Sequence, residues 1–243
     1  MNRDEVVRVW TQVGRQSGGE PLSVAHVCAA AVAGVGADGA AVSLMVNSTV
    51  RDMVHATNQV AGELEEWQVS FGQGPCVDAL AAGGPVLAVD LGLPDYSRRW
   101  PVFTPAALDS GARAVFALPL QVGAIRLGVM DLYRARPGGL SPYELSDALA
   151  FADAAGILLL EGAAAIQLDG SDWQDDPTAH QAQVHQATGM ILAQLGISAE
   201  AAFARLRAYA FAHDRRIGDV ARDVVGRKLR FQPDPIPDGD DDV

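Results

Sequence analysis

The sequence predicts an α+β fold, in which an N-terminal domain with an antiparallel sheet flanked by helices is joined through a long helix to a small three-helix module. Three observations carry this prediction. Two pairs of alternating apolar stretches indicate β-hairpins, one apolar run beginning at Ser141 is long enough for a continuous helix, and a segment with helical spacing follows a polar boundary. With 243 residues, of which 49% are hydrophobic, the chain can bury one sizeable core and a smaller one.

The N-terminal domain begins with two predicted helices, Asp4–Val13 and Leu22–Val35. The next two stretches, Ala40–Val46 and Asp52–Thr57, alternate in the manner of strands, and the polar residues 47–49 between them are typical of a turn. We therefore expect an antiparallel hairpin here.

A helix over Val60–Ser70 is expected next, with three glutamates on its solvent-facing side: Glu63, Glu65 and Glu66. The glycine-rich stretch from Phe71 to Cys76 then leads into a short helix ending near Ala81, because proline suits the first turn of a helix. A strand over Pro85–Val89 follows.

The clearest strands are Ala114–Leu120 and Ile125–Arg134, which form the second predicted hairpin. A helix begins after them, with Ser141 as its N-cap, Pro142 in its first position and a glutamate two residues further on. It can run to about Leu168, which corresponds to ~40 Å at 1.5 Å per residue.

These patterns divide the chain into an α+β domain over residues 1–168, a polar linker over 169–177, a helical module over 178–231 and an acidic, proline-containing tail over 232–243 that is predicted to be disordered. The net charge of −12 is distributed unevenly over these parts. It is −11 before Thr178 and −5 in the tail, whereas Thr178–Phe231 carries +4. A small basic segment in an acidic chain is typical of a phosphate-binding surface.

The two cysteines, Cys28 and Cys76, form no C-x-x-C pair and accompany no histidine cluster, so neither a disulfide framework, a zinc site nor another cofactor is indicated. The N-terminus is charged and lacks the apolar stretch of a signal peptide. The run Ala150–Leu160 is too short to cross a bilayer. These features predict a cytoplasmic protein without membrane segments.

Two motifs in the N-terminal domain occur in a known order: Gly72-Gln-Gly-Pro-Cys76 before a short strand, and Ala117-Leu-Pro-Leu120 before Leu127-Gly-Val-Met-Asp-Leu-Tyr133. With the order of helices and hairpins, this part resembles a GAF domain over roughly Pro21–Ala165. The resemblance implies a central antiparallel sheet, helices packed together on one face, and a small-molecule ligand of unknown identity on the other.

Two alternatives concern single residues of this domain. Cys76 suggests a redox enzyme or sensor, because one GAF branch reduces free methionine sulfoxide, but a lone cysteine is more often a buried apolar group. His26 or His55 could ligate haem, although isolated histidines are usually structural. We expect no catalytic residue.

Three apolar stripes at helical spacing define the C-terminal module, and Gly196 and Ser198 separate the first two helices as a stop and an N-cap. The stripes are Val184, Ala187, Ile191 and Leu195; then Ala202, Phe203, Leu206 and Ala210; and then Ile217, Val220, Ala221, Val224 and Val225. Helices this short are unstable alone, so we expect the three to pack together.

The module resembles an ANTAR domain, through Gln186-Ala-Thr-Gly-Met-Ile-Leu192, Ala201-Ala-Phe-Ala-Arg-Leu-Arg207 and Arg215-Arg-Ile-Gly-Asp-Val-Ala-Arg-Asp-Val-Val225. This family of transcription antiterminators binds paired RNA hairpins. Thr188 stands where the family often has lysine, which removes one charge. Small residues at Ala187, Gly189 and Ala221 are expected to let a base or backbone approach closely, and arginines can hold phosphates or stack on bases.

The residues predicted to contact RNA are Thr188, Gly189, Arg205, Arg207, Tyr209, His213, Arg215, Arg216 and Arg222. The alternative for the arginines is a solvated face with ion pairs to Asp219 and Asp223, which would make the module a protein-interaction surface instead. Paired hairpins need two modules, so we expect a homodimer joined through the long helices, regulated by a signal at the N-terminal domain.

Overall fold

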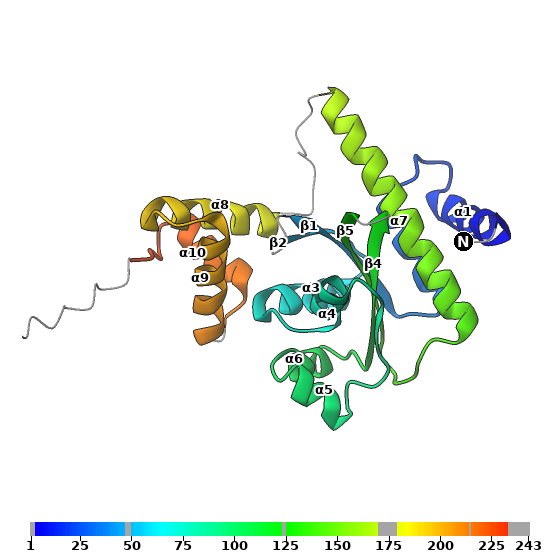
Figure 1. Ribbon diagram of the computed structural model, residues 1–243, viewed down its shortest axis with the longest axis horizontal. Coiled ribbons are helices and arrows are strands. Elements are labelled where there is room, and N and C mark those ends of the chain that lie inside the picture. Colours follow the sequence, from blue (N-terminus) through cyan, green and yellow to red (C-terminus); the bar gives the residue numbers. More distant parts are fainter. Residues whose placement is uncertain (1–2, 47–49, 123–124, 170–178, 214, 233–243) are drawn as a thin grey trace, which may run out of the picture. The chain divides into compact units, whose positions relative to one another are not determined.

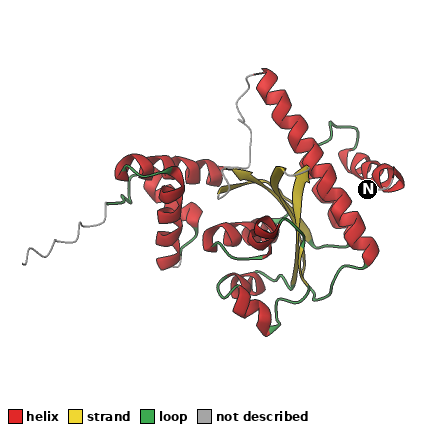
Figure 2. Cartoon of the chain, viewed as in Figure 1, coloured by secondary structure: helices red, strands yellow, loops and turns green. Residues whose placement is uncertain are grey.

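A computed structural model describes residues 3–46, 50–122, 125–169, 179–213 and 215–232. The chain divides into two compact units, Met1–Thr178 and Ala179–Val243. Figure 1 labels the helices and strands, and Figure 2 distinguishes the helical from the extended segments. The predicted linker lies outside the described residues from 170, and the predicted disordered tail lies outside them from 233.

The first unit is built on a five-stranded antiparallel sheet of order β2-β1-β5-β4-β3. Its strands are β1 (Gly39–Val46), β2 (Val50–Ala56), β3 (Val86–Ala88), β4 (Ala114–Val122) and β5 (Ile125–Arg134). Both predicted hairpins are confirmed, as β1–β2 and β4–β5. The two hairpins join where β1 approaches β5, and a Cβ atom at Gly128 would lie 2.0 Å from the carbonyl oxygen of Ser43. Only glycine fits this contact.

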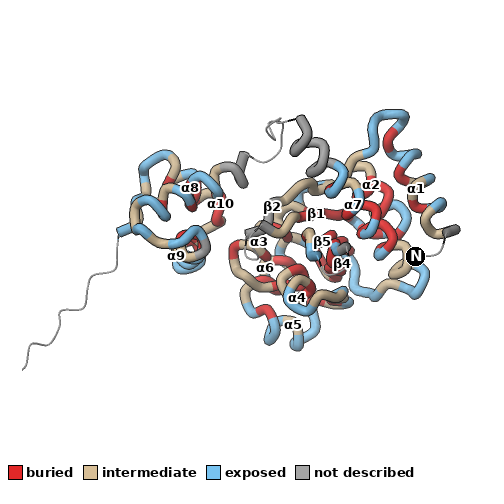
Figure 3. The backbone as a smooth tube through the Cα atoms, turned by 45° about the horizontal axis from the view of Figure 1, so that its top comes forward, coloured by how far each residue is buried: buried red, intermediate tan, exposed pale blue. Residues whose placement is uncertain are grey.

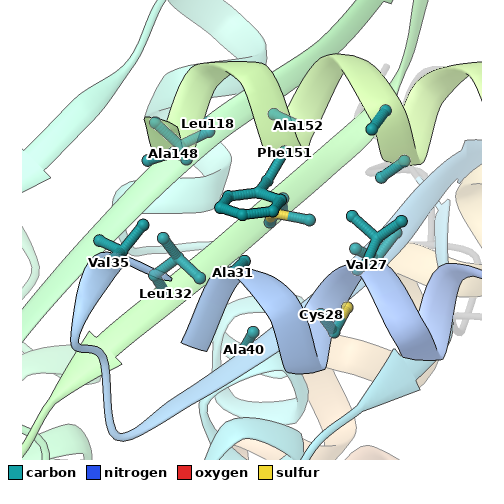
Figure 4. Packing of buried hydrophobic residues seen from close by; sticks show 14 of the residues in the cluster. Val27, Cys28, Ala31, Val35, Ala40, Leu118, Leu132, Ala148, Phe151 and Ala152 are labelled. Carbon is teal, nitrogen blue, oxygen red and sulfur yellow. The ribbon is translucent and has the colours of Figure 1, made fainter. Parts of the chain in front are cut away.

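One face of the sheet is covered by α2 (Val24–Val35) and α7 (Pro142–Asp169), and α1 (Arg3–Ser17) packs against these two helices. Phe151 of α7 is fully buried and points between α2 and the strands, beside Ala31 and Leu132 (Figure 4). The many alanines of α2 and α7 let the two helices approach each other closely. Helix α2 begins two residues later than predicted, after Ser23, so Leu22 remains 42% exposed.

The opposite face carries α3 (Gln59–Phe71) and α4 (Pro75–Ala82), followed by α5 (Pro94–Arg99) and α6 (Phe103–Asp109). Helices α5 and α6 were not predicted from the sequence. They are short and start at or near prolines, and neither is long enough to display an apolar period. Trp100 and Phe103, both buried, anchor this region through an edge-to-face contact with ring centroids 6.0 Å apart.

The start of α7 is fixed by the predicted capping box. The backbone N–H of Glu144 donates to Ser141 Oγ at 3.2 Å, and the backbone N–H of Ser141 donates to Glu144 Oε2 at 2.6 Å. Glu144 Oε1 also accepts from the buried Arg134 guanidinium at 2.6 Å, and folding lowers the pKa of Glu144 to about 2. Hydrogen bonds from Ser141 are the largest cause of this low pKa, and Arg134 adds to them.

Arg134 links three elements at this point. It ends β5 and donates to the carbonyl oxygens of Val35, Gly36 and Gly139 at 2.6, 3.1 and 3.0 Å. The end of α2, the end of the sheet and the start of the long helix are therefore held by one buried side chain.

The second unit contains three helices, α8 (Ala179–Leu195), α9 (Ala199–Ala212) and α10 (Ile217–Val225), and each packs against the other two. Ser198 is the predicted N-cap of α9, and its Oγ accepts from the backbone N–H of Ala201 at 3.2 Å. The buried segments of these helices face inward (Figure 3). The apolar residues of this core are Ala187, Ile191, Ala202, Phe203, Leu206, Ala210, Ile217, Val220, Ala221 and Val224.

None of the helices in the described part of the chain combines the length and the apolar character that a bilayer crossing requires.

Candidate functional site

The cationic residues of the second unit lie on the outside of its three-helix core. On α9, Arg205 and Arg207 are half-buried, and at the start of α10 Arg216 is half-buried in the N-cap position. Arg227, Lys228 and Arg230, which follow α10, are exposed. The unit therefore presents basic side chains around an apolar interior, as a phosphate-binding surface requires.

Two of the predicted arginines form ion pairs within the unit. Arg215 donates to Asp223 Oδ2 at 2.7 Å, and Arg222 donates to Asp219 Oδ1 at 2.7 Å. The hydrogen bond from Arg215 lowers the pKa of Asp223. Part of the positive charge of Arg215 and Arg222 is thus compensated before any RNA approaches, as the ion-pair alternative anticipated.

An aromatic group lies beside this surface. The Tyr209 ring stacks on the His213 ring with centroids 3.9 Å apart, and Phe231 meets Tyr209 edge-on at 5.5 Å. The backbone N–H of Phe231 donates to Gln194 Oε1 at 3.0 Å, so the segment after α10 returns to α8 and α9. The packing of Phe231 against α8 and α9 was not predicted, because it depends on contacts between residues 37 apart in the chain.

Of the three small residues expected to allow close approach of RNA, two are buried and one is exposed. Ala187 and Ala221 are fully buried and serve close packing of α8 against α10, so they do not admit a base or an RNA backbone. Gly189 is exposed, and a Cβ atom there would contact nothing within 4 Å. Thr188 is only 8% exposed, and its hydroxyl donates to the carbonyl oxygen of Val184 at 2.7 Å, inside the helix.

In the first unit, five polar residues form a buried group that we call the polar cluster: Ser43, Glu65, Gln68, Cys76 and Asp131. All are between 0% and 6% exposed. They come from β1, α3, α4 and β5, on the face of the sheet opposite α2 and α7. The expectation that Glu65 faces solvent is therefore wrong, because α3 turns this side chain toward the sheet.

Hydrogen bonds connect the polar cluster. Ser43 Oγ donates to Glu65 Oε2 at 2.6 Å, and Gln68 Nε2 donates to Glu65 Oε1 at 3.2 Å and to Asp131 Oδ2 at 2.5 Å. Gln68 Oε1 accepts from the backbone N–H of Cys76 at 2.7 Å. The single amide of Gln68 thereby orients both carboxylates and the start of α4.

Gly74 leaves the space that the side chain of Gln68 occupies. Its φ of +125° belongs to a region that side-chain-bearing residues rarely adopt, and a Cβ atom there would lie 2.6 Å from Gln68 Oε1. The glycine-rich motif before α4 thus serves close packing. A signal for the polar cluster was present in the sequence as Asp131, an acidic residue in the middle of an otherwise apolar strand.

The single residues considered for redox or haem chemistry are placed as follows. Cys76 is fully buried at the start of α4, and burial denies a substrate access to its thiol. His26 and His55 are half-buried, and His26 Nδ1 lies 3.0 Å from Ser23 Oγ. Burial, together with the nearby His26, lowers the pKa of His55.

The fold and these two sites define a protein of two parts, in which a domain with an enclosed polar cluster precedes a basic helical module. A GAF domain model matches residues 24–160 and an ANTAR domain model matches residues 178–225. The chain belongs to the GAF domain family and carries an ANTAR domain at its C-terminal end. This combination is that of an RNA-binding antitermination regulator with a signal-sensing domain, a regulatory architecture rather than a catalytic one.

One solved structure supports the fold of the first unit, and others are similar to it at lower scores. The GAF domain from a phosphoenolpyruvate-protein phosphotransferase of Coxiella burnetii is 14% identical, with a TM-score of 0.50, and the match covers 68% of this chain and 98% of that one. The corresponding Acinetobacter domain is 10% identical, with a TM-score of 0.48 and coverages of 68% and 97%.

A type II free methionine-R-sulfoxide reductase from Thermoplasma acidophilum is 15% identical, with a TM-score of 0.35 and coverages of 51% and 80%. This similarity is too low to support a shared activity. No curated protein matches the chain.

Proposed function

We propose that this protein binds paired RNA hairpins in leader transcripts as a homodimer and thereby controls transcription antitermination in the cytoplasm. The observation that carries the proposal is the ANTAR match over a unit whose core is apolar and whose basic residues lie outside it. RNA loops are a better target than duplexes for so small a surface, because their unstacked bases are accessible.

Within this surface we assign phosphate contacts to Arg205, Arg207, Arg215, Arg216 and Arg222. Arg215 and Arg222 already form ion pairs with Asp223 and Asp219. An RNA phosphate would have to compete with carboxylates that already accept hydrogen bonds at 2.7 Å.

The stacked rings of Tyr209 and His213 offer an aromatic face on which an unpaired base can lie. Gly189 gives the backbone of α8 an unobstructed approach on its exposed side. Thr188 acts indirectly through helix α8, because its hydroxyl is engaged with Val184.

Helix α7 supports the homodimer. Leu149, Ile157 and Leu160 are 38–40% exposed and follow one another at spacings of eight and three residues, which places them on one side of the helix. A second copy of α7 would cover them and hold two RNA-binding modules together. Two linked modules bind two linked hairpins with an avidity that neither module has alone.

Signal transmission follows from how α7 starts. Its first turn is fastened to the sheet by Arg134 and Glu144, and its other end leads through the linker to the RNA-binding module. A ligand that shifts the sheet relative to α7 would change the geometry of the dimer and so the spacing of the modules. In this proposal residues 1–168 form the sensor domain, 178–231 the RNA-binding domain and 232–243 a solubilising tail.

The test uses the full chain at near-physiological salt and three labelled probes: an RNA with two hairpins, an RNA with one, and a DNA duplex of the same length. Fluorescence anisotropy is expected to show the tightest binding to the double hairpin. Arg207→Ala should weaken that binding by about tenfold, which corresponds to ~1.4 kcal/mol. The matched control, Arg98→Ala, removes an exposed arginine of the first unit and should change nothing.

Equal affinity for the three probes would refute the hairpin proposal and leave a protein-interaction module as the explanation of the basic surface. Equal affinity of wild type and Arg207→Ala, with preference for the double hairpin retained, would place the interface on another face of the module.

A further inference from the structure

The polar cluster brings together three side chains whose atoms are typical metal ligands. The carboxylate oxygens of Glu65 and Asp131 and the sulfur of Cys76 all lie within 4.8 Å of one another, and all three residues are buried. They come from three separate elements, α3, α4 and β5, so their convergence is a product of the fold.

We propose that Glu65, Cys76 and Asp131 bind a divalent first-row transition metal ion. The geometry is compatible with such an ion after a small movement. Ligand atoms around a tetrahedral ion with bonds of about 2.0–2.3 Å are roughly 3.5 Å apart. Side-chain adjustments on the order of 1 Å therefore bring the three atoms to coordinating positions.

The charges of the cluster favour a bound cation. Glu65 and Asp131 share Gln68 as a hydrogen-bond donor, so two carboxylates lie close together in a region shielded from water. Two negative charges in such a place need compensation by a proton or by a cation. Both oxygens of Glu65 accept hydrogen bonds, from Ser43 and from Gln68.

The chemistry of the ligands selects the class of metal. A thiolate is a soft ligand that favours ions such as Zn²⁺ and Fe²⁺, whereas Mg²⁺ and Ca²⁺ take only oxygen ligands. Three protein ligands fill three of the four positions around a tetrahedral ion. In metal sites, residues that do not bind the ion often orient the ligands by hydrogen bonds. Ser43 and Gln68 have this role here, because they donate hydrogen bonds to the carboxylates of Glu65 and Asp131.

Cys28 provides a matched control within the same domain. It is equally buried, but it lies among the apolar residues between the sheet and α2, and burial raises its pKa to about 12. A thiol in that environment stays protonated, and its neighbours in this cluster are apolar side chains.

The experiment uses the full chain, stripped of metal with a chelator and titrated with Co²⁺, which replaces Zn²⁺ and absorbs visibly. The wild type is expected to bind one Co²⁺ per chain and to show a thiolate-to-cobalt charge-transfer band. Cys76→Ser should abolish the band, Cys28→Ser should keep it, and Glu65→Gln or Asp131→Asn should weaken Co²⁺ binding at least tenfold. Circular dichroism verifies that each variant is folded.

The proposal is overturned if the wild type shows no thiolate band, or if the band persists in Cys76→Ser. A melting temperature that Zn²⁺ leaves unchanged would indicate that a proton alone compensates the two carboxylates, which also contradicts the proposal. Should Cys76→Ser fail to fold, the wild-type band and Glu65→Gln still decide the question. Because none of these measurements involves RNA, their outcome is independent of the hairpin-binding test.

Discussion

The contact between Arg134 and Glu144 gives a prediction that can be worked out in detail. Replacing Glu144 with glutamine keeps the shape of the side chain but removes its charge and one of its two acceptor oxygens. In the wild type, one oxygen accepts from Arg134 and the other from the backbone N–H of Ser141, both at 2.6 Å. In the variant, one of these donors faces an N–H₂ group instead.

The expected loss of stability follows from burial. The Arg134 side chain is 8% exposed, so its charge is left with only carbonyl oxygens as acceptors, whereas Glu144 is one third exposed and solvent screens part of the effect. Breaking a fully buried pair costs ~3–5 kcal/mol and an exposed pair ~0–1 kcal/mol. We therefore expect Glu144→Gln to lower the free energy of unfolding of the first unit by about 2 kcal/mol at pH 7.

The loss should depend on pH, with a defined sign. The pKa of Glu144 is lowered from 4.5 to about 2 by folding, so its contribution is fully present above pH 4.5 and disappears as the pH falls toward 2. Wild type and variant should consequently converge in stability under acid conditions.

Urea unfolding followed by tryptophan fluorescence is a suitable assay. Trp10, Trp67 and Trp100 lie in the described part of the first unit, and the second unit contains no tryptophan in its sequence, so the signal reports the first unit. Asp95→Asn, which disrupts the exposed pair with Arg98, is the control and should change stability by less than about 0.5 kcal/mol. A loss in Glu144→Gln that is equally small, or one that stays the same from pH 7 to pH 3, would refute the reasoning.

Three further predictions concern packing, burial and capping. Phe151→Ala should destabilise the first unit by ~3–5 kcal/mol in the same urea assay, because the ring is fully buried. Tyr143→Ala, at a residue of α7 that is 86% exposed, should cost little, and similar losses in both variants would contradict the assigned orientation of the helix. Cys28 should resist iodoacetamide in the native chain at pH 8.5 and react only in urea, because the native thiol has a pKa of about 12. For the same reason the free energy of unfolding should fall as the pH rises past 9. Rapid alkylation of the native chain, measured by mass spectrometry, would show that this site opens. Ser198→Ala should lower the stability of the helical module by about 1 kcal/mol, because it removes the N-cap hydrogen bond from Ala201. Circular dichroism should show this as a lower melting temperature. An unchanged melting temperature would mean that this hydrogen bond contributes nothing.

Local patterns predicted much of this fold correctly. Strands β4 and β5 alternate over a long run, and the capping box at Ser141 and Glu144 depends only on residues three apart, so neither required knowledge of distant contacts. The three helices of the C-terminal module were predicted for the same reason, since a helical stripe is a property of one segment.

Predictions that depended on which side of an element faces the interior were less successful. Glu65 was expected in solvent, and Ala187 and Ala221 were expected to admit RNA, yet all three are buried. A charged residue on an amphipathic helix usually faces water, and nothing within α3 indicates that its partners are Ser43 on β1 and Asp131 through Gln68.

The sequence alone predicted most of the elements in order and a basic helical segment after a larger domain, because these follow from local spacing and from the distribution of charge. The resemblance to GAF and ANTAR domains came from motifs that occur in a known order. Only the tertiary structure decided which arginines are already paired, and that Glu65, Cys76 and Asp131 meet. Cys76 and Asp131 are 55 positions apart in the chain, and the sheet order β2-β1-β5-β4-β3 with α3 and α4 on one face is what brings them together.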